Sequence, residues 1–139
     1  MAIPKTFLIS REEDYHTHYI GVYENGNQFF AYENMVNRND NGTYLTLYIF
    51  DNEGHFIDHK YWHKGLTPIY GTDIETITEN MIESFGPYEF ADYITVEPFQ
   101  IEIDGTIFGL IPDENLKHIN LQPNLSIMFY SPWDGSYDS

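Results

Sequence analysis

Cysteine is absent from the 139-residue sequence, and its absence excludes several kinds of site at once. Without thiols there is no disulfide, no thiolate zinc site and no cysteine nucleophile. Long apolar runs are missing too, since no stretch approaches the roughly 18 apolar residues that cross a bilayer. The apolar stretch within residues 1–10 is too short for a secretion signal. We therefore expect a cytoplasmic protein that does not contact membranes.

Basic residues are also scarce. Six Lys and Arg face 22 Asp and Glu, which gives a formal net charge of −16. The imbalance is concentrated in residues 71–139, where one base, Lys117, accompanies thirteen acids. Such a surface repels nucleic-acid phosphates and attracts basic protein surfaces. We expect no binding to nucleic acid, because there is neither a basic patch nor a helix-turn-helix pattern.

The sequence does contain enough apolar material for a folded core. Hydrophobic residues make up 42% of the chain, and 12 Tyr, 10 Phe and 2 Trp are among them. Disordered acidic chains have few aromatic residues, so the acidity does not indicate disorder here. The length predicts a single domain over residues 1–139, with no linker and no internal repeat.

Turn signals divide the first half of the chain into strands. Asn25-Gly26, between the alternating segments 18–23 and 28–35, predicts a hairpin. Residues 43–50 are apolar on both faces, which is typical of a central strand. The polar turn at 51–54 leads into a further strand over 55–62.

The apolar period changes from two to 3.6 in the middle of the chain. One face of the expected helix carries Ile74, Ile77, Met81 and Phe85. Thr72 and Glu75 form a capping box at its start, and Gly86-Pro87 ends it. This pattern predicts one long amphipathic helix at about 72–85.

Strand signals return after the helix. Asp104-Gly105 predicts a hairpin between 93–103 and 106–111, and Pro98 indicates a bulge or an edge position within the first of these. Two more strands are expected over 118–121 and 125–130. Together the elements predict an α+β domain, with a mostly antiparallel sheet of about six to eight strands and one long helix.

Histidine supplies the candidate metal ligands. On extended strands His16 and His18 would share one face, as would His55, His59 and His63. Imidazoles near carboxylates can hold zinc or iron. Their spacing matches no compact zinc motif, however, and half-exposed strand histidines are commoner than ligands. We expect no metal and no cofactor, with these five histidines as the candidates should a metal bind.

Two surfaces are candidates for binding a partner protein. The outer face of the expected helix carries Glu75, Glu79 and Glu83, with no base to pair them. It is either a solvated face or a docking face for a basic protein. The tail carries Trp133, Asp134 and Tyr137. We expect it to fold back onto the sheet, although exposed aromatics there would anchor a partner.

Several stretches of the chain together form one pattern: Ala2-Ile3-Pro4-Lys5, Tyr15-His16-Thr17-His18-Tyr19-Ile20-Gly21, Asn25-Gly26-Asn27-Gln28-Phe29, Gly86-Pro87-Tyr88-Glu89-Phe90, Glu102-Ile103-Asp104-Gly105, Phe108-Gly109-Leu110 and Pro132-Trp133-Asp134-Gly135-Ser136-Tyr137-Asp138. Together they resemble a bacterial protein family labelled formate hydrogenlyase regulatory protein. The resemblance spans nearly the whole chain, and its most specific part is the Trp-Asp-Gly tail. Segment 33–70 is shorter and more divergent than the family pattern. The resemblance implies a non-enzymatic regulator, with no catalytic residues to transfer.

These observations favour a non-enzymatic, acidic protein-interaction module with a regulatory role, which binds a basic surface of another protein. A close variant is an immunity-type inhibitor that neutralises a basic, nuclease-like toxin by charge complementarity. The alternative from a different class is a small metal-dependent enzyme built on histidines and carboxylates.

Overall fold

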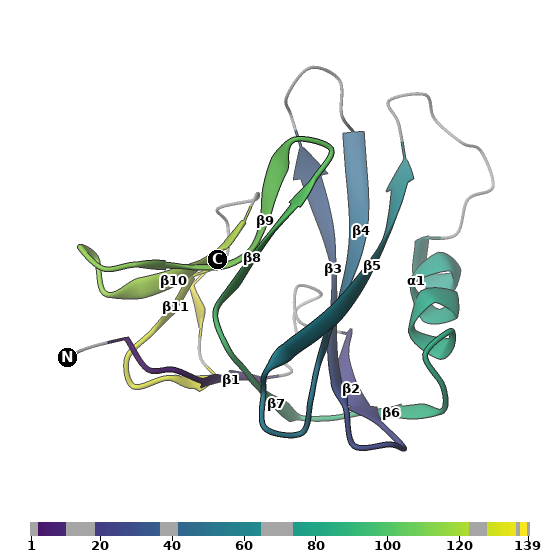
Figure 1. Ribbon diagram of the computed structural model, residues 1–139, viewed down its shortest axis with the longest axis horizontal. Coiled ribbons are helices and arrows are strands. Elements are labelled where there is room, and N and C mark those ends of the chain that lie inside the picture. The colour runs from purple at the N-terminus through teal and green to yellow at the C-terminus, as the bar shows by residue number, and fades with distance from the viewer. Residues whose placement is uncertain are drawn as a thin grey trace.

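The computed structural model describes residues 3–10, 19–36, 42–64, 74–122, 128–135 and 137–138. Within these ranges the chain forms thirteen strands in three sheets and one short helix (Figure 1). The fold is therefore mostly β, and the prediction of an α+β domain with a single main sheet is wrong. No helix in the described ranges is long and apolar enough to cross a membrane.

The first five-stranded sheet contains the hairpins of the first half of the chain. Its strands are antiparallel and stand in the order β5-β4-β3-β2-β6. The predicted hairpin at Asn25-Gly26 is confirmed, and the amide of Tyr23 donates to the carbonyl of Asn27 (2.7 Å). The strands are β2 (Tyr19–Tyr23), β3 (Gln28–Val36), β4 (Gly42–Phe50), β5 (Phe56–Lys64) and β6 (Tyr88–Phe90).

Strand β4 is the central strand that its two-sided apolarity predicts. It lies between β3 and β5, and its described side chains are buried on both faces. Tyr48 and Phe50 belong to the core shared by all three sheets, whereas Leu47 and Ile49 point to the opposite face, which the helix covers.

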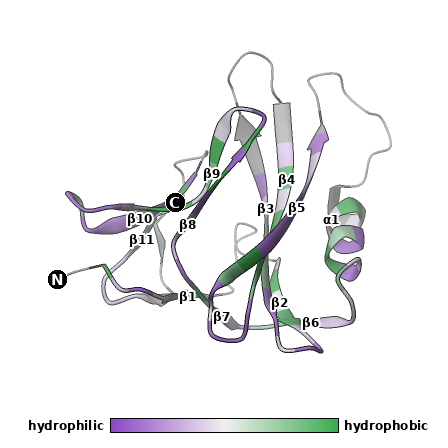
Figure 2. Ribbon diagram, in the orientation of Figure 1, coloured by the Kyte–Doolittle hydropathy of each residue, from purple (hydrophilic) through white to green (hydrophobic). Residues whose placement is uncertain are grey.

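The helix α1 (Ile74–Glu83) is ten residues long, shorter than the helix predicted at about 72–85. It packs Ile77, Met81 and Ile82 against the first sheet, and Figure 2 shows hydrophobic and hydrophilic residues interspersed around it. The chain leaves the helix at Ser84–Gly86 through a turn in which Gly86 adopts a φ of 120°, so Phe85 keeps its apolar contact without being helical. Thr72 of the expected capping box lies outside the described residues.

The segment expected to be one strand over 93–103 is two strands in two different sheets. The strand β7 (Tyr93–Val96) pairs with β1 (Phe7–Ser10), and β8 (Phe99–Ile103) pairs with β9 (Thr106–Asp113). The chain changes sheet at Glu97-Pro98, where proline has no amide hydrogen to donate to a ladder. The predicted Asp104-Gly105 hairpin is confirmed, with φ values of 51° and 82°.

The second five-stranded sheet has the order β13-β11-β10-β9-β8. The remaining strands in it are β10 (His118–Gln122), β11 (Met128–Tyr130) and β13 (Tyr137–Asp138). Its inner side chains, Leu110, Ile119 and Phe129 among them, pack with Phe30 and Tyr48 of the first sheet. Burial between sheets, with little helix involved, explains why the fold is mostly β.

The tail folds back, as expected. The strand β12 (Asp134–Gly135) pairs in parallel with β1 in the three-stranded sheet. Trp133 is partly buried against the shared core, and its ring centroid lies 6.0 Å from that of Phe7. Pairing with the amino-terminal strand is what holds the tail, a long-range contact that no local pattern reveals.

Candidate functional site

The acidic stripe of α1 is present on the folded surface. Glu83 is exposed and Glu79 is half-buried, while for Glu75 the structure describes only the backbone. Neither Glu79 nor Glu83 forms an ion pair with any described residue. The helix has no base in its last turn, and Glu83 stands there at the negative end of its dipole.

Tyr88 on β6 brings this stripe together with a second element. Burial is the largest cause that raises the pKa of the Tyr88 hydroxyl, and the negative charges of Glu79 and Glu83 raise it further. These charges act on Tyr88 because the end of α1 and the start of β6 lie close together, joined by Ser84–Pro87 (Figure 1).

Three adjoining shallow hollows surround Pro87 and Tyr88. Their volumes are about 270, 290 and 460 Å³. We refer to them together as the Tyr88 hollow. Its lining residues are aromatic, apolar and acidic, and they include Tyr23, Glu24, Glu83, Pro87, Tyr88 and Glu89. Acidic residues from the β2–β3 turn, α1 and β6 thus line adjoining hollows, with Glu89 on the face of β6 opposite to Tyr88.

The floor of the hollow is firmly held. The hydroxyl of Tyr23 donates to the carbonyl of Ile82 (2.8 Å), and burial raises the pKa of this hydroxyl. Its ring centroid lies 5.1 Å from that of Phe29 and 6.3 Å from that of Tyr88. The amide of Glu24 donates to the carbonyl of Pro87 (2.9 Å), which ties the β2–β3 turn to β6. A surface fixed in this way needs little reorganisation to bind a partner.

Gly21 allows β6 to approach β2 closely. A β-carbon at this position would stand 2.3 Å from the carbonyl oxygen of Glu89 and 2.6 Å from the ring of Phe29. Glycine is therefore needed where β6 and the aromatic floor come together. The consequence is that Glu89 and Tyr88 are placed beside the β2–β3 turn.

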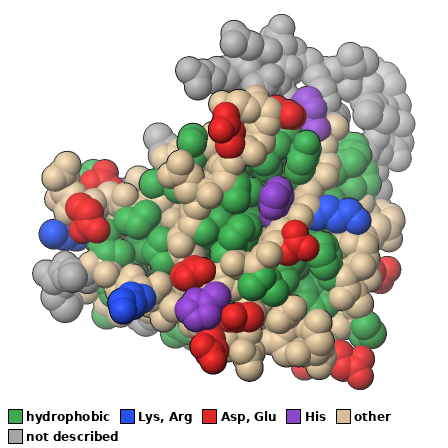
Figure 3. Space-filling view, in the orientation of Figure 1, with side chains coloured by type: hydrophobic (Ala, Val, Ile, Leu, Met, Phe, Trp, Pro, Cys, Tyr) green, Lys and Arg blue, Asp and Glu red, His purple; other side chains and the backbone are tan. Residues whose placement is uncertain are grey.

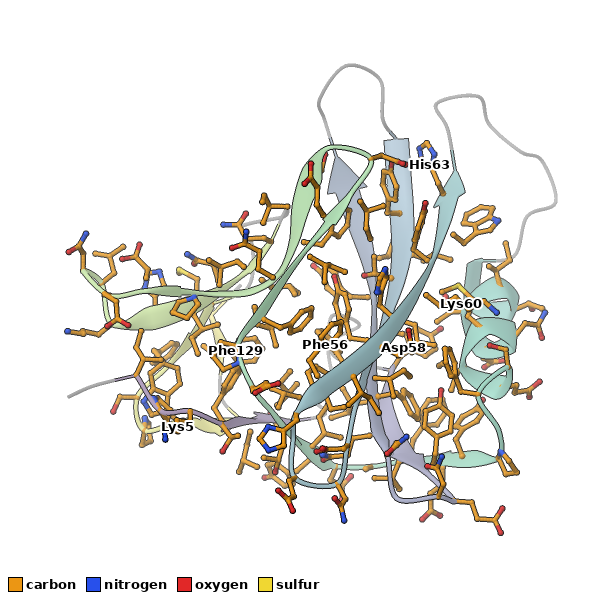
Figure 4. All side chains as sticks on the ribbon, in the orientation of Figure 1. Lys5, Phe56, Asp58, Lys60, His63 and Phe129 are labelled. Carbon is orange, nitrogen blue, oxygen red and sulfur yellow. The ribbon has the colours of Figure 1, made fainter. Side chains whose placement is uncertain are left out.

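Lys60 on β5 is the base that reaches the end of the helix. Its ammonium donates to the hydroxyl of Ser84 (3.0 Å), which in turn donates to the carbonyl of Met81 (2.6 Å). Figure 4 labels Lys60 on the side of β5 that faces α1. Lys60 lies more than 4 Å from every described carboxylate, so it leaves the acids of the hollow unpaired.

The structure separates the candidate metal ligands. His59 and His63 share one face of β5, with His63 stacked on Tyr44 at a centroid distance of 4.2 Å. His55 lies in the preceding turn, where its ring contacts Glu97 (3.3 Å) and Glu53 (3.6 Å). A shift in pairing between Ile49 and Phe50 removes His55 from the common face expected for the three. His16 and His18 lie outside the described residues, and no group of three or more His, Asp or Glu in the described ranges could hold a metal.

The tail lies on the other side of the molecule from α1 and β6 (Figure 1). Trp133 packs against Phe7, whereas for Asp134 and Tyr137 the description covers the backbone alone. The two predicted partner-binding surfaces, the helix stripe and the tail, therefore do not form one site. Figure 3 shows basic side chains scattered singly over the viewed face of the molecule.

Glu24, Glu89, Tyr23 and Tyr88 are functional candidates that the sequence did not reveal. Val22 pairs with Glu89 across 67 positions of sequence, and no local pattern indicates that pairing. The one available signal was the aromatic Tyr88-Glu89-Phe90 segment directly after the helix stop, which has the alternation of a short strand.

No family model, curated protein or solved structure matches this chain.

Proposed function

We propose that this chain is a non-enzymatic protein-interaction module that binds a basic surface of a partner protein through the Tyr88 hollow and the helix stripe beside it. The observation that carries the proposal is that acidic residues from three chain segments line adjoining shallow hollows beside Pro87 and Tyr88. The regulatory character of the proposal comes from the sequence resemblance given above. The immunity-type variant, with a nuclease-like partner, would use the same surface.

Two physical effects support this function. The net charge of −16 creates a long-range field that speeds encounter with a basic protein. Aromatic side chains at the centre of the site then supply contact area that loses little conformational entropy on binding. Charge thus governs the association rate, and the hollow governs how long the complex lasts.

The experiment compares two double variants that change the net charge equally. Glu83→Gln/Glu89→Gln removes two carboxylates of the hollow, and Glu102→Gln/Glu114→Gln removes two exposed carboxylates on β8 and the β9–β10 turn. A partner is captured from the native host at low salt, and its association with each variant is followed by surface plasmon resonance. We expect the hollow pair to slow association several-fold more than the control pair. Equal effects of the two pairs would contradict binding at the hollow.

A further inference from the structure

The outer edge of β5 is a second interaction surface. We propose that it pairs with the same strand of a second copy of this chain, antiparallel and about a two-fold axis at Tyr61. This pairing makes the first five-stranded sheets of the two copies continuous. The inference goes beyond the proposed function, because β5 and the β6 strand of the Tyr88 hollow stand at opposite ends of the sheet.

Two observations show which backbone groups β5 turns to its outer edge. In an antiparallel ladder, successive residues direct their amide and carbonyl groups alternately to one neighbouring strand and to the other. The amide of His59 donates to the carboxylate of Asp58 (2.7 Å), so it points away from β4. The same phase follows from the hydrogen bond between Tyr23 and Asn27 when the alternation is counted across β3 and β4. The amide and carbonyl of Tyr61, two residues beyond His59, therefore point outward, where no described strand pairs with β5.

The same edge exposes apolar side chains. Ile57 is 50% exposed and Tyr61 is 42% exposed, while Trp62 is half-buried on the face that α1 covers. Figure 1 draws β5 in front of β4 and β3, and Figure 3 shows hydrophobic side chains at the surface on both sides of it. A nine-residue edge strand with exposed apolar side chains and no proline is a template for a strand from another chain.

Charge identifies a second copy as the occupant that fits. Among the described helix and strands, β5 is the one with a positive formal charge, since it carries two lysines and one aspartate. Two copies of a chain with a net charge of −16 repel each other least when they approach through this strand. Lysine on an edge strand usually prevents pairing, so the register has to keep the lysines of the two copies apart.

A two-fold axis at Tyr61 meets that condition. It sets Lys60 opposite Trp62 of the second copy, and Asp58 opposite position 64, which is lysine in the sequence. The Lys60 ammonium is held at Ser84 (3.0 Å) on the α1 side of the sheet, which is also the side of Trp62. Each pair occurs twice by symmetry, and both attract, one as a cation beside an aromatic ring and the other as opposite charges.

The neighbouring registers are less favourable. An axis at Lys60 would set this lysine against itself, and an axis at Trp62 would set it against Lys64. An axis at His59 would bring the bulge in the pairing of β5 with β4 into the new ladder. An axis at His63 would leave only the last three residues of the strand to pair. The β5 edge is thus self-complementary about Tyr61.

The first test measures the oligomeric state of the intact chain. Sedimentation equilibrium between about 0.01 and 1 mM protein covers the range of a weak dimer. We expect the mass to rise with concentration toward that of two chains. Dimerisation should strengthen as sodium chloride rises from about 0.01 to 0.1 M, because salt screens the repulsion between two acidic copies. The mass of a single chain at every concentration and salt would overturn the proposal.

Two charge reversals test the register. Asp58→Lys places lysine opposite lysine, and Lys64→Asp places aspartate opposite aspartate. Each variant alone should dimerise at least about fivefold more weakly than the wild type, because two symmetric pairs change from attraction to repulsion. Mixed in equal amounts, the two variants should form a heterodimer about as tight as the wild-type dimer, since every lysine then faces an aspartate.

Circular dichroism checks that both variants keep the fold. Glu114→Lys, at an exposed position of the β9–β10 turn, is the matched control, because it changes the net charge as Asp58→Lys does. It should leave the dimer at least as tight as that of the wild type. A mixture of the two β5 variants that stays monomeric, or single variants that dimerise like the wild type, would contradict pairing of β5 about Tyr61.

Discussion

At the scale of single residues, Gln28 holds two sheets together. Its side chain is buried on β3, where Nε2 donates to the carbonyls of Asp51 (2.8 Å) and Thr95 (2.9 Å). Its Oε1 accepts the amide of Thr95 (2.8 Å), on β7 of the three-stranded sheet. One amide side chain thus satisfies three partly buried backbone groups.

Replacing Gln28 with Leu should therefore destabilise the fold markedly. Leucine has a similar size but leaves these three backbone groups without partners, which costs about 2–4 kcal/mol in total. The free energy of unfolding is measured by urea denaturation. Gln100→Leu, at an exposed position of β8, is the control and should change it by less than about 0.5 kcal/mol. A Gln28→Leu value as small as the control would show that the three bonds contribute little.

Two tyrosines of β4, Tyr44 and Tyr48, differ in whether their hydroxyl groups form a hydrogen bond. The Tyr48 hydroxyl is fully buried and has no hydrogen-bond partner among the described residues, whereas the Tyr44 hydroxyl donates to Asp104 Oδ2 (2.8 Å). Burial raises the pKa of Tyr48, and the Thr46 side chain acts in the opposite direction. Burial, followed by the hydrogen bond to Asp104, raises the pKa of Tyr44 to about 12.

Removing the two hydroxyl groups should therefore change the stability of the fold in different directions. Tyr48→Phe should leave stability equal or higher, because an unpaired buried hydroxyl is lost. Tyr44→Phe should cost about 1 kcal/mol, because a hydrogen bond to a carboxylate is lost. The midpoints of urea unfolding measure both. A clear loss of stability in Tyr48→Phe would mean that its hydroxyl does have a partner, and the neighbouring Thr46 side chain, which lowers the pKa of Tyr48, is the first candidate.

At the scale of elements, the sequence predicts hairpins formed by neighbouring strands but does not predict pairings between strands far apart in the chain. The hairpins at Asn25-Gly26 and Asp104-Gly105 could be predicted because a two-residue turn fixes the pairing of its own neighbours. The division into three sheets could not be predicted, because β1 pairs with β7 and β12, which both lie far from it in the sequence. The helix stripe was visible from its period, but the acids that complete the hollow depend on the distant β2–β6 pairing. The helix was predicted too long because Phe85 fits the apolar period while lying in the turn beyond it.

His55 connects two elements, and the direction of its pKa shift predicts a pH-dependent contribution to stability. Its Nδ1 lies 3.3 Å from Glu97 Oε1, while Glu97 Oε2 accepts the amide of Phe56 (2.7 Å). The β4–β5 turn is thereby linked to the junction of β7 and β8. The hydrogen bond to Glu97 is the largest cause that raises the pKa of His55, and the charges of Asp51, Glu97 and Glu53 raise it further.

The direction of the pKa shift determines the pH dependence. The folded pKa lies above the ordinary value of 6.5, so the stabilising contribution is complete below pH 6.5. It is lost as the pH rises through the raised value. We expect the difference in unfolding midpoint between the wild type and His55→Asn to shrink across this window. Thermal unfolding at a series of pH values measures it, and a difference that stays constant or grows with pH would contradict the link to Glu97.

At the scale of the whole molecule, the same charge has two opposing consequences. With a net charge of −16, the acids repel one another in the folded state, and this repulsion destabilises the fold at low salt. The field that they create also attracts a basic partner from a distance. Salt screens both effects, since the Debye length falls from about 30 Å at 0.01 M to about 10 Å at 0.1 M.

Added salt should therefore move stability and binding in opposite directions. Between about 0.01 and 0.1 M sodium chloride the melting temperature should rise, because self-repulsion is screened, while the association rate with the partner falls. Differential scanning fluorimetry and surface plasmon resonance in the same buffers measure the two trends. The Glu83→Gln/Glu89→Gln variant should show a flatter salt dependence of association than the wild type, because two of the charges nearest the partner are gone. Association that is insensitive to salt would mean that the partner contacts a surface other than the acidic one, even if the melting temperature rises as expected.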